Sequence, residues 1–188
     1  MQERAVNTLK LLGISGSLRK ASYNTLLVKE GARLFGSCIF ELADIRLPLY
    51  DGDLEAEHGL PPEVICLHDQ IVRSDAVVIS TPEYNKNLPG VLKNALDWVS
   101  RKGPMPFKDK PVAIVSAAGW TGGARAQYSL RHCLTPFHPH VIQGPEVLIA
   151  GPSAAFTESG QLANEQSLDF LAELMLALRK AAEDQVGA

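Results

Sequence analysis

The fold is constrained most strongly by a strand-length apolar run that leads through a stiff loop into a helix. Residues 76–79 read Ala-Val-Val-Ile, and such a β-branched run favours a buried strand. Pro82 and Pro89 bracket the loop that follows and fix φ at two positions. Beyond it, apolar residues recur at helical spacing and predict a helix over 89–101. A buried strand followed by a loop and a helix is the repeating unit of an α/β fold.

The rest of the chain repeats this alternation. Strands are predicted over 6–14, 38–43, 76–80, 111–117 and 141–149, and helices over 23–35, 63–73, 89–101, 124–134 and 164–182. Strict alternation predicts a parallel sheet covered by helices on both faces. Residues 44–62 contain Pro48, Gly52, Gly59 and a Pro-Pro pair, so a long loop is predicted there.

Size and charge limit the classes of function. The 188 residues, 46% of them hydrophobic, fit one domain over 1–188. A net charge of -3 argues against a nucleic-acid partner, which favours a basic surface. No apolar run approaches the ~20 residues needed for a membrane span, and the N-terminus lacks the apolar core of a signal peptide. Cys38, Cys66 and Cys133 form no Cys-x-x-Cys pair, so buried, reduced thiols and a cytoplasmic location are expected.

Two other kinds of site are disfavoured. His138 and His140 have no third ligand at sensible spacing, so no metal site is expected. Hydrolysis by a Ser-His-Asp triad would need a Gly-x-Ser-x-Gly elbow, which is absent.

The loop after the first strand has the composition of an anion site. It carries the hydroxyls of Ser17 and Ser22, the charge of Arg19 and the amide of Asn24, all at a helix N-terminus. Backbone amides and the helix dipole favour an anion there, and hydroxyl donors with one arginine suit a terminal phosphate. Neither Gly-x-Gly-x-x-Gly nor a Walker loop occurs. The alternative is that Ser22 or Asn24 merely caps the helix.

Two further loops follow the third and fourth strands. The second loop, 82–87, combines exposed backbone amides with Tyr84 and Asn85, which suits a flat heteroaromatic ligand with polar edges. The third loop, 116–125, is rich in small residues that let the backbone approach a ligand. Its Trp120 covers either the site or a partner subunit, or is simply half-exposed. In a doubly wound sheet these three loops are neighbours beside the switch point.

A longer pattern carries a family resemblance. Pro82-Glu83-Tyr84-Asn85, followed by Pro89-Gly90, Leu92-Lys93-Asn94-Ala95 and Asp97-Trp98, resembles the signature of the NADPH-dependent FMN reductase family. That family includes flavin, quinone and chromate reductases. The resemblance implies a flavodoxin-like three-layer α/β sandwich with a five-stranded parallel sheet in the order 2-1-3-4-5. Asn94, Asp97 and Trp98 lie on the predicted helix, where we expect structural roles.

The resemblance also implies where FMN binds. The residues implied for the phosphate are Ser15, Ser17, Arg19, Ser22 and Asn24, those along the isoalloxazine edge are Pro82, Glu83, Tyr84 and Asn85, and those against its pyrimidine side are Ser116, Ala117, Gly119 and Gly122. Asn87 stands where relatives often carry serine.

The implied activity passes hydride from NADPH or NADH through FMN to a small acceptor such as free flavin, quinone or chromate, in a ping-pong cycle. No side chain has to act as an acid or base in the hydride step, so no catalytic residue is assigned. The family forms dimers and tetramers, and Arg125, Tyr128 and Glu146 could supply polar contacts between subunits. The alternatives are a flavodoxin-like electron carrier, for which a charge of -3 is mild, and a structural protein without FMN.

Overall fold

The computed structural model describes residues 8–187 and contains one parallel sheet. Its strands are β1 (Lys10–Ser15), β2 (Ile39–Leu42), β3 (Ala76–Thr81), β4 (Pro111–Ala118), β5 (His140–Val141) and β6 (Val147–Ala150). They are ordered β2-β1-β3-β4-β5, with β6 also paired to β4. This confirms the predicted fold class and strand order. The part of the first predicted strand at residues 6 and 7 lies outside the described residues.

The predicted fifth strand is wrong in one respect, because it is divided in two. β5 pairs with the start of β4 through Pro111 and Val112, and β6 pairs with its end, from Val115 to Ala118. The interruption contains Gly144 and Pro145. Proline has no amide hydrogen to donate to a ladder. At Gly144 the backbone runs so close to α6 (Glu165–Val186) that a Cβ would lie 2.9 Å from Leu174 Cδ1.

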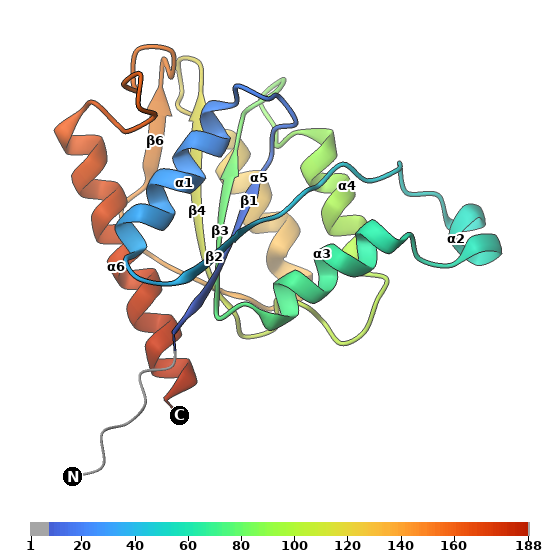
Figure 1. The fold of residues 1–188 in the computed structure, drawn as a ribbon. Coiled ribbons are helices and arrows are strands. Elements are labelled where there is room, and N and C mark those ends of the chain that lie inside the picture. Colours follow the sequence, from blue (N-terminus) through green and yellow to red (C-terminus); the bar gives the residue numbers. More distant parts are fainter. Residues whose placement is uncertain (1–7, 188) are drawn as a thin grey trace, which may run out of the picture.

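The remaining helices cover both faces of the sheet (Figure 1). They are α1 (Tyr23–Phe35), α2 (Gly52–His58), α3 (Pro62–Arg73), α4 (Gly90–Val99) and α5 (Ala124–Leu134), which a short 3₁₀ turn follows at Thr135–Phe137. α1 and α6 lie on one face and α3, α4 and α5 on the other. The predicted helices are therefore all present, with ends that differ by a few residues.

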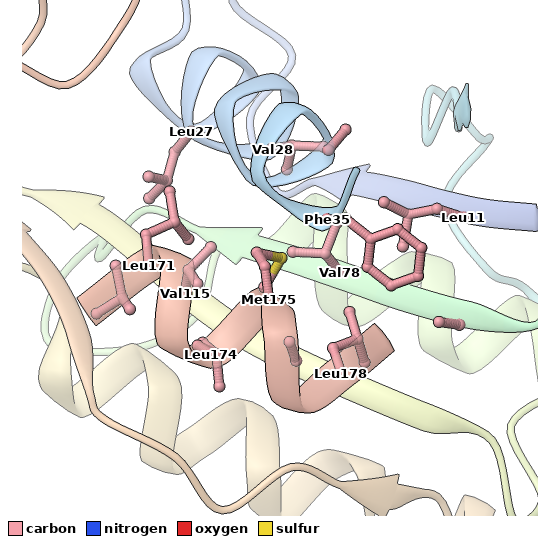
Figure 2. Packing of buried hydrophobic residues seen from close by; sticks show 14 of the residues in the cluster. Leu11, Leu27, Val28, Phe35, Val78, Val115, Leu171, Leu174, Met175 and Leu178 are labelled. Atoms are coloured by element: carbon pink, nitrogen blue, oxygen red, sulfur yellow. The ribbon is translucent and has the colours of Figure 1, made fainter. Parts of the chain in front are cut away.

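Alternate residues of the central strands supply the two cores. On one face, Val78 and Val115 pack against α1 and α6 (Figure 2). On the other, Val77 and Ile79 pack against the helices α3 to α5. All six residues of β3 are buried, as the uninterrupted apolar run predicts for a strand covered on both sides.

The predicted long loop over 44–62 contains a helix that the sequence analysis missed. α2 has no buried residue, so it has no apolar face to reveal it in the pattern. Residues 48–50 of this segment are anchored to α4 by hydrogen bonds with its side chains. Trp98 Nε1 and Asn94 Nδ2 both donate to the Pro48 carbonyl, at 2.7 and 2.9 Å, and Asn94 Oδ1 accepts from the Tyr50 amide at 2.9 Å. The structural roles predicted for Asn94 and Trp98 are confirmed.

The three cysteines are free thiols. Cys38 and Cys133 are only half-buried and Cys66 is exposed on α3, so the expectation of buried thiols is wrong. None of the helices in residues 8–187 is long and apolar enough to cross a membrane.

Candidate functional site

The loops after β1, β3 and β4 meet at one edge of the sheet (Figure 1). Gly16 in the first loop donates its amide to the Ser80 carbonyl at 2.7 Å. The two chains run so close that a Cβ on Gly16 would lie 3.1 Å from Pro82 Cδ. The three loops therefore lie together, as the sequence analysis predicts for neighbours beside the switch point. This edge is where ligands bind in open α/β sheets.

The first loop presents unused donors at the N-terminus of α1. Among residues 8–187, the amides of Leu18, Lys20 and Ser22 meet no hydrogen-bond acceptor, and the exposed Arg19 guanidinium has no partner. Ser22 is the N-cap of α1 and accepts a long bond, 3.4 Å, from the Thr25 amide. Capping and anion binding are therefore compatible at Ser22, and this set of donors fits a phosphate.

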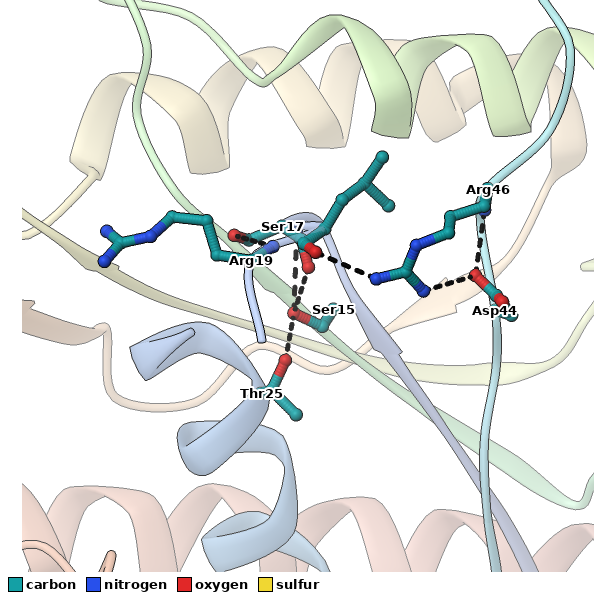
Figure 3. Close-up of polar contacts among 7 residues, drawn as sticks. Ser15, Ser17, Arg19, Thr25, Asp44 and Arg46 are labelled. Carbon is teal, nitrogen blue, oxygen red and sulfur yellow. Dashed lines mark hydrogen bonds and ion pairs between the residues drawn. The ribbon is translucent and has the colours of Figure 1, made fainter. Parts of the chain in front are cut away.

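Contacts among side chains hold this loop in shape (Figure 3). Thr25 Oγ1 donates to Ser15 Oγ at 2.9 Å, and the Ser17 amide lies 3.4 Å from the same oxygen. Ser15 and Ser17 are both buried. Their hydroxyls therefore form part of the framework of the loop.

Arg46 supports the first loop and was missed by the sequence analysis. Its Nη2 donates to the Leu18 carbonyl at 2.9 Å, and its Nη1 lies 3.1 Å from Asp44 Oδ1 (Figure 3). A hollow of about 250 Å³ adjoins these residues, between the first loop and the segment after β2. The only available signal was that Arg46 is the one Lys or Arg between residues 44 and 62.

The second loop folds back on itself in a tight turn. The backbones of Tyr84 and Asn87 exchange hydrogen bonds of 3.0 and 3.1 Å. The two residues between them, Asn85 and Lys86, have φ of 51° and 66°, which is the pattern of a type I′ turn. Tyr84 is half-exposed and Pro82 is buried. The backbone of the loop is therefore rigidly shaped and its aromatic ring is accessible.

Glu83 connects the second loop to α5. The Arg125 amide donates to Glu83 Oε2 at 3.1 Å, and the Arg125 guanidinium lies 3.3 Å from Oε1. The Glu83 side chain is only 9% exposed, and its charge lies at a helix N-terminus, where the dipole favours it. The Asn87 side chain also reaches α5, where it accepts from the Ser129 hydroxyl.

The third loop is closed by glycines and by Ser116. Gly122 and Gly123 have φ of 61° and 96°, and a Cβ on either would come within 2.8 Å of other atoms. Ser116 is fully buried, and its hydroxyl donates to the Gly122 carbonyl at 2.6 Å and accepts from Gln127 at 2.8 Å. Gly119 is exposed, and Trp120 is completely exposed, so its ring covers nothing in the described residues 8–187. The accessible part of this loop is its backbone around Gly119.

Two of the predicted binding residues are directed away from the edge of the site. Ser116 is used in closing its own loop, and Asn24 points inward between β3 and β4. The site therefore has two ends. The end at the first loop is lined by backbone amides and carries the positive charge of Arg19. The end at the second and third loops is lined by backbone and carries the ring of Tyr84. A doubly wound sheet with this order and these loops defines a flavodoxin-like nucleotide-binding protein.

Comparisons with known proteins narrow this class. The family model for NADPH-dependent FMN reductase matches residues 9–153. The chain is 45% identical over 175 residues to an NAD(P)H-dependent FMN reductase of Pseudomonas aeruginosa, across 91% of this chain and 94% of that protein. It is 39% identical over 170 residues to a quinone reductase of Escherichia coli, across 87% of this chain and 89% of that one.

Among solved structures, the flavoenzyme FerB of Paracoccus denitrificans, an NAD(P)H:(acceptor) oxidoreductase, superposes with a TM-score of 0.80 at 33% identity. The match covers 94% of this chain and 98% of that chain. The chain belongs to the NADPH-dependent FMN reductase family. It is thus an FMN-dependent oxidoreductase, and the resemblance noted in the sequence is confirmed.

Proposed function

We propose that this protein oxidises NADPH or NADH and reduces a small soluble acceptor at a site formed by its three loops. The observation that carries the proposal is their convergence. At one end are amides and a guanidinium that meet no acceptor within residues 8–187, and at the other is the tight turn of the second loop beside the Tyr84 ring. Bound FMN would supply the two-electron redox chemistry between the nicotinamide and the acceptor, and the acceptor would bind after the nicotinamide has left.

The residues have distinct parts in this proposal. Arg19 and the amides around Ser22 bind the phosphate by charge-assisted hydrogen bonds. The backbone from Pro82 to Asn85 holds one edge of the ring, and the backbone near Gly119 holds its pyrimidine side. The rigid turn at Asn85 keeps the ring in place for hydride transfer, where correct positioning alone lowers the barrier.

Stopped-flow spectroscopy tests the proposal against the electron-carrier alternative. Anaerobic mixing of the FMN-loaded protein with NADPH, and separately with NADH, should bleach the flavin absorbance at about 450 nm within seconds, as turnover of typical enzymes requires. Reoxidation is then followed with benzoquinone, chromate and free FMN in turn. A protein that binds FMN but is bleached by neither nucleotide would be a carrier or a binding module, and the proposal would fail.

Quinones are the acceptors that we expect to react fastest. The support is that a relative 39% identical to this chain is named a quinone reductase. A planar quinone can lie against the same face of the ring that the nicotinamide leaves. Faster reoxidation by chromate or by free FMN than by benzoquinone would contradict this preference.

We further propose that the protein is a cytoplasmic homodimer or homotetramer. Exposed aromatic side chains lie on the second loop, on the third loop and on α5, namely Tyr84 at 50%, Trp120 at 101% and Tyr128 at 65% exposure. Closed symmetry is the usual way for identical chains to cover such surfaces. Light scattering at micromolar concentration is the test, and a fully active monomer would contradict the proposal.

A further inference from the structure

The side chain of Asn24 is buried between the ends of two strands. It is the second residue of α1 and is 4% exposed. Its Oδ1 accepts from the Ser80 hydroxyl at 2.8 Å and from the Ala117 amide at 3.1 Å, while its Nδ2 donates to the Ala117 carbonyl at 2.9 Å. Because a backbone amide can only donate and a carbonyl can only accept, Ala117 dictates the orientation of the carboxamide.

The carboxamide of Asn24 takes the place of a missing strand residue. The last pair in register between β3 and β4 is Thr81 with Ser116. The register between the two strands ends there, before Ala117. Ala117 makes both of its hydrogen bonds on this side with Asn24 instead. The side chain thus extends the sheet by one position where the second and third loops separate.

Ser80 links the same point to the first loop. Its carbonyl accepts from the Gly16 amide at 2.7 Å, and its hydroxyl donates to Asn24. The bases of all three loops therefore meet at one buried carboxamide. A change at this residue alters the distance between the second and third loops.

Asn24 has little capacity left for a phosphate. Both lone pairs of its Oδ1 are used, and one hydrogen of Nδ2 remains free. An oxygen acceptor cannot bind a phosphate oxygen in any case. The unpaired donors at the N-terminus of α1 are the amides around Ser22 and the Arg19 guanidinium.

We propose that Asn24 is a positioning residue that sets the separation of the second and third loops, and so holds the flavin ring, and that it is not a ligand of the phosphate. This inference rests on the proposed placement of FMN across the three loops. It assigns to Asn24 a different role from the one implied by the family resemblance.

The test compares FMN with riboflavin, which has the same ring and no phosphate. Titration of the apoprotein by fluorescence quenching gives the two dissociation constants. We expect Asn24→Ala to weaken both flavins by a similar factor, about tenfold or more, because buried Ala117 groups lose their partner. In contrast, Arg19→Ala should weaken FMN and leave riboflavin unchanged. Weakening of FMN alone by Asn24→Ala would overturn the inference.

A matched asparagine provides the control. Asn164 caps α6 by accepting from the Ser167 amide at 2.8 Å, far along the chain from the three loops. Asn164→Ala should lower thermal stability and leave both flavin affinities unchanged. Should Asn24→Ala fail to fold, Ser80→Ala removes only one of the three bonds. It should weaken both flavins by about threefold, and unchanged affinity for both would overturn the inference.

The experiment also distinguishes a wrong placement of FMN from a wrong role for Asn24. An unchanged FMN affinity in Arg19→Ala would move the phosphate away from the first loop. The riboflavin measurement on Asn24→Ala would still report on the ring, because riboflavin carries no phosphate.

Discussion

Glu83 and Arg125 join the second loop to the N-terminus of α5 through two contacts, at 3.1 Å from the amide and 3.3 Å from the guanidinium. The sequence analysis names Arg125 among residues that could supply polar contacts between subunits; within this chain its guanidinium is paired with Glu83. The partner of Glu83 is thus the cationic side chain of Arg125. Its position indicates a structural role for the carboxylate.

Replacing Glu83 should therefore show whether its carboxylate supports the conformation of the second loop or transfers a proton. Glu83→Gln keeps an oxygen that can accept from the Arg125 amide, and the arginine of the ion pair is exposed. We therefore expect flavin reduction to slow by less than about fivefold, which corresponds to roughly 1 kcal/mol. Tyr84→Gly, which loosens the turn, should cost more. Rates of flavin bleaching at saturating FMN provide the measurement. A thousandfold loss in Glu83→Gln with FMN still bound would mean that the carboxyl transfers a proton.

The phosphate end of the site should depend on Arg19 and Ser22. Combining Arg19→Ala with Ser22→Ala removes charge-assisted hydrogen bonds that contribute roughly 1.5–3 kcal/mol each. FMN affinity should then fall by at least about a hundredfold in an equilibrium titration. Lys20→Ala is the control, because Lys20 is exposed and has no assigned contact. An equal loss of FMN affinity in Lys20→Ala and in the double variant would show that FMN responds only to the overall positive charge of the loop.

Glycine at position 86 should stabilise the tight turn at Asn85 and Lys86. Lys86 has a φ of 66°, which costs a residue with a Cβ more than it costs glycine. Lys86→Gly should raise the free energy of unfolding by about 0.5–1 kcal/mol, as measured by urea titration. Lys29→Gly, on the exposed side of α1, should lower it by about 1 kcal/mol. A loss of stability in Lys86→Gly would contradict the strain argument.

The segment over 44–61 should be released by removing one donor on α4. Trp98→Phe keeps a ring against Tyr50 but loses the 2.7 Å bond to the Pro48 carbonyl. We expect a loss of about 0.5–1.5 kcal/mol and faster proteolytic cleavage between residues 49 and 58. Trp120→Phe, at a fully exposed position, provides the control. Equal cleavage rates in the two variants would show that Trp98 does not hold the segment.

Stability should fall in acid partly through Glu41. The hydrogen bond from the Arg73 guanidinium is the main cause that lowers the pKa of the Glu41 carboxyl, with a smaller contribution from Gln70 and an opposing one from burial. A lowered folded-state pKa stabilises the protein above the unfolded value of about 4.3, and this contribution disappears as the pH falls through the folded-state value.

Glu41→Gln should thus cost about 0.2–1 kcal/mol at pH 7, since the pair is partly exposed. The difference from the unsubstituted protein should shrink as the pH falls below the unfolded value of about 4.3. Urea titrations at a series of pH values on both sides of that value measure it. A difference that stays constant across the series would mean that the carboxylate charge is not the cause.

Local pattern was sufficient for most of the framework. The uninterrupted apolar run of β3 and the helical spacing after Pro89 are patterns among residues close together in the sequence, and burial on both faces or on one face follows directly from them. The choice of the three loops also came from the sequence, because each follows a predicted strand end. The sequence analysis missed α2 because a helix without a buried face has no periodic pattern of apolar residues.

Tertiary structure alone decided how the side chains at the site are used. Asn24 meets Ala117 across 93 residues, Glu83 meets Arg125 across 42, and Arg46 meets Leu18 across 28. The sequence shows which residues can donate or accept, but it does not give the distance between them. Hydrogen bonds form only within about 3.5 Å. The sequence by itself therefore determined that Asn24 stands at the start of a helix, beside the loop that we propose binds the phosphate. Only the packing of α1 against the ends of β3 and β4 decided that its carboxamide turns inward, because the backbone groups of Ala117 would otherwise be buried without partners.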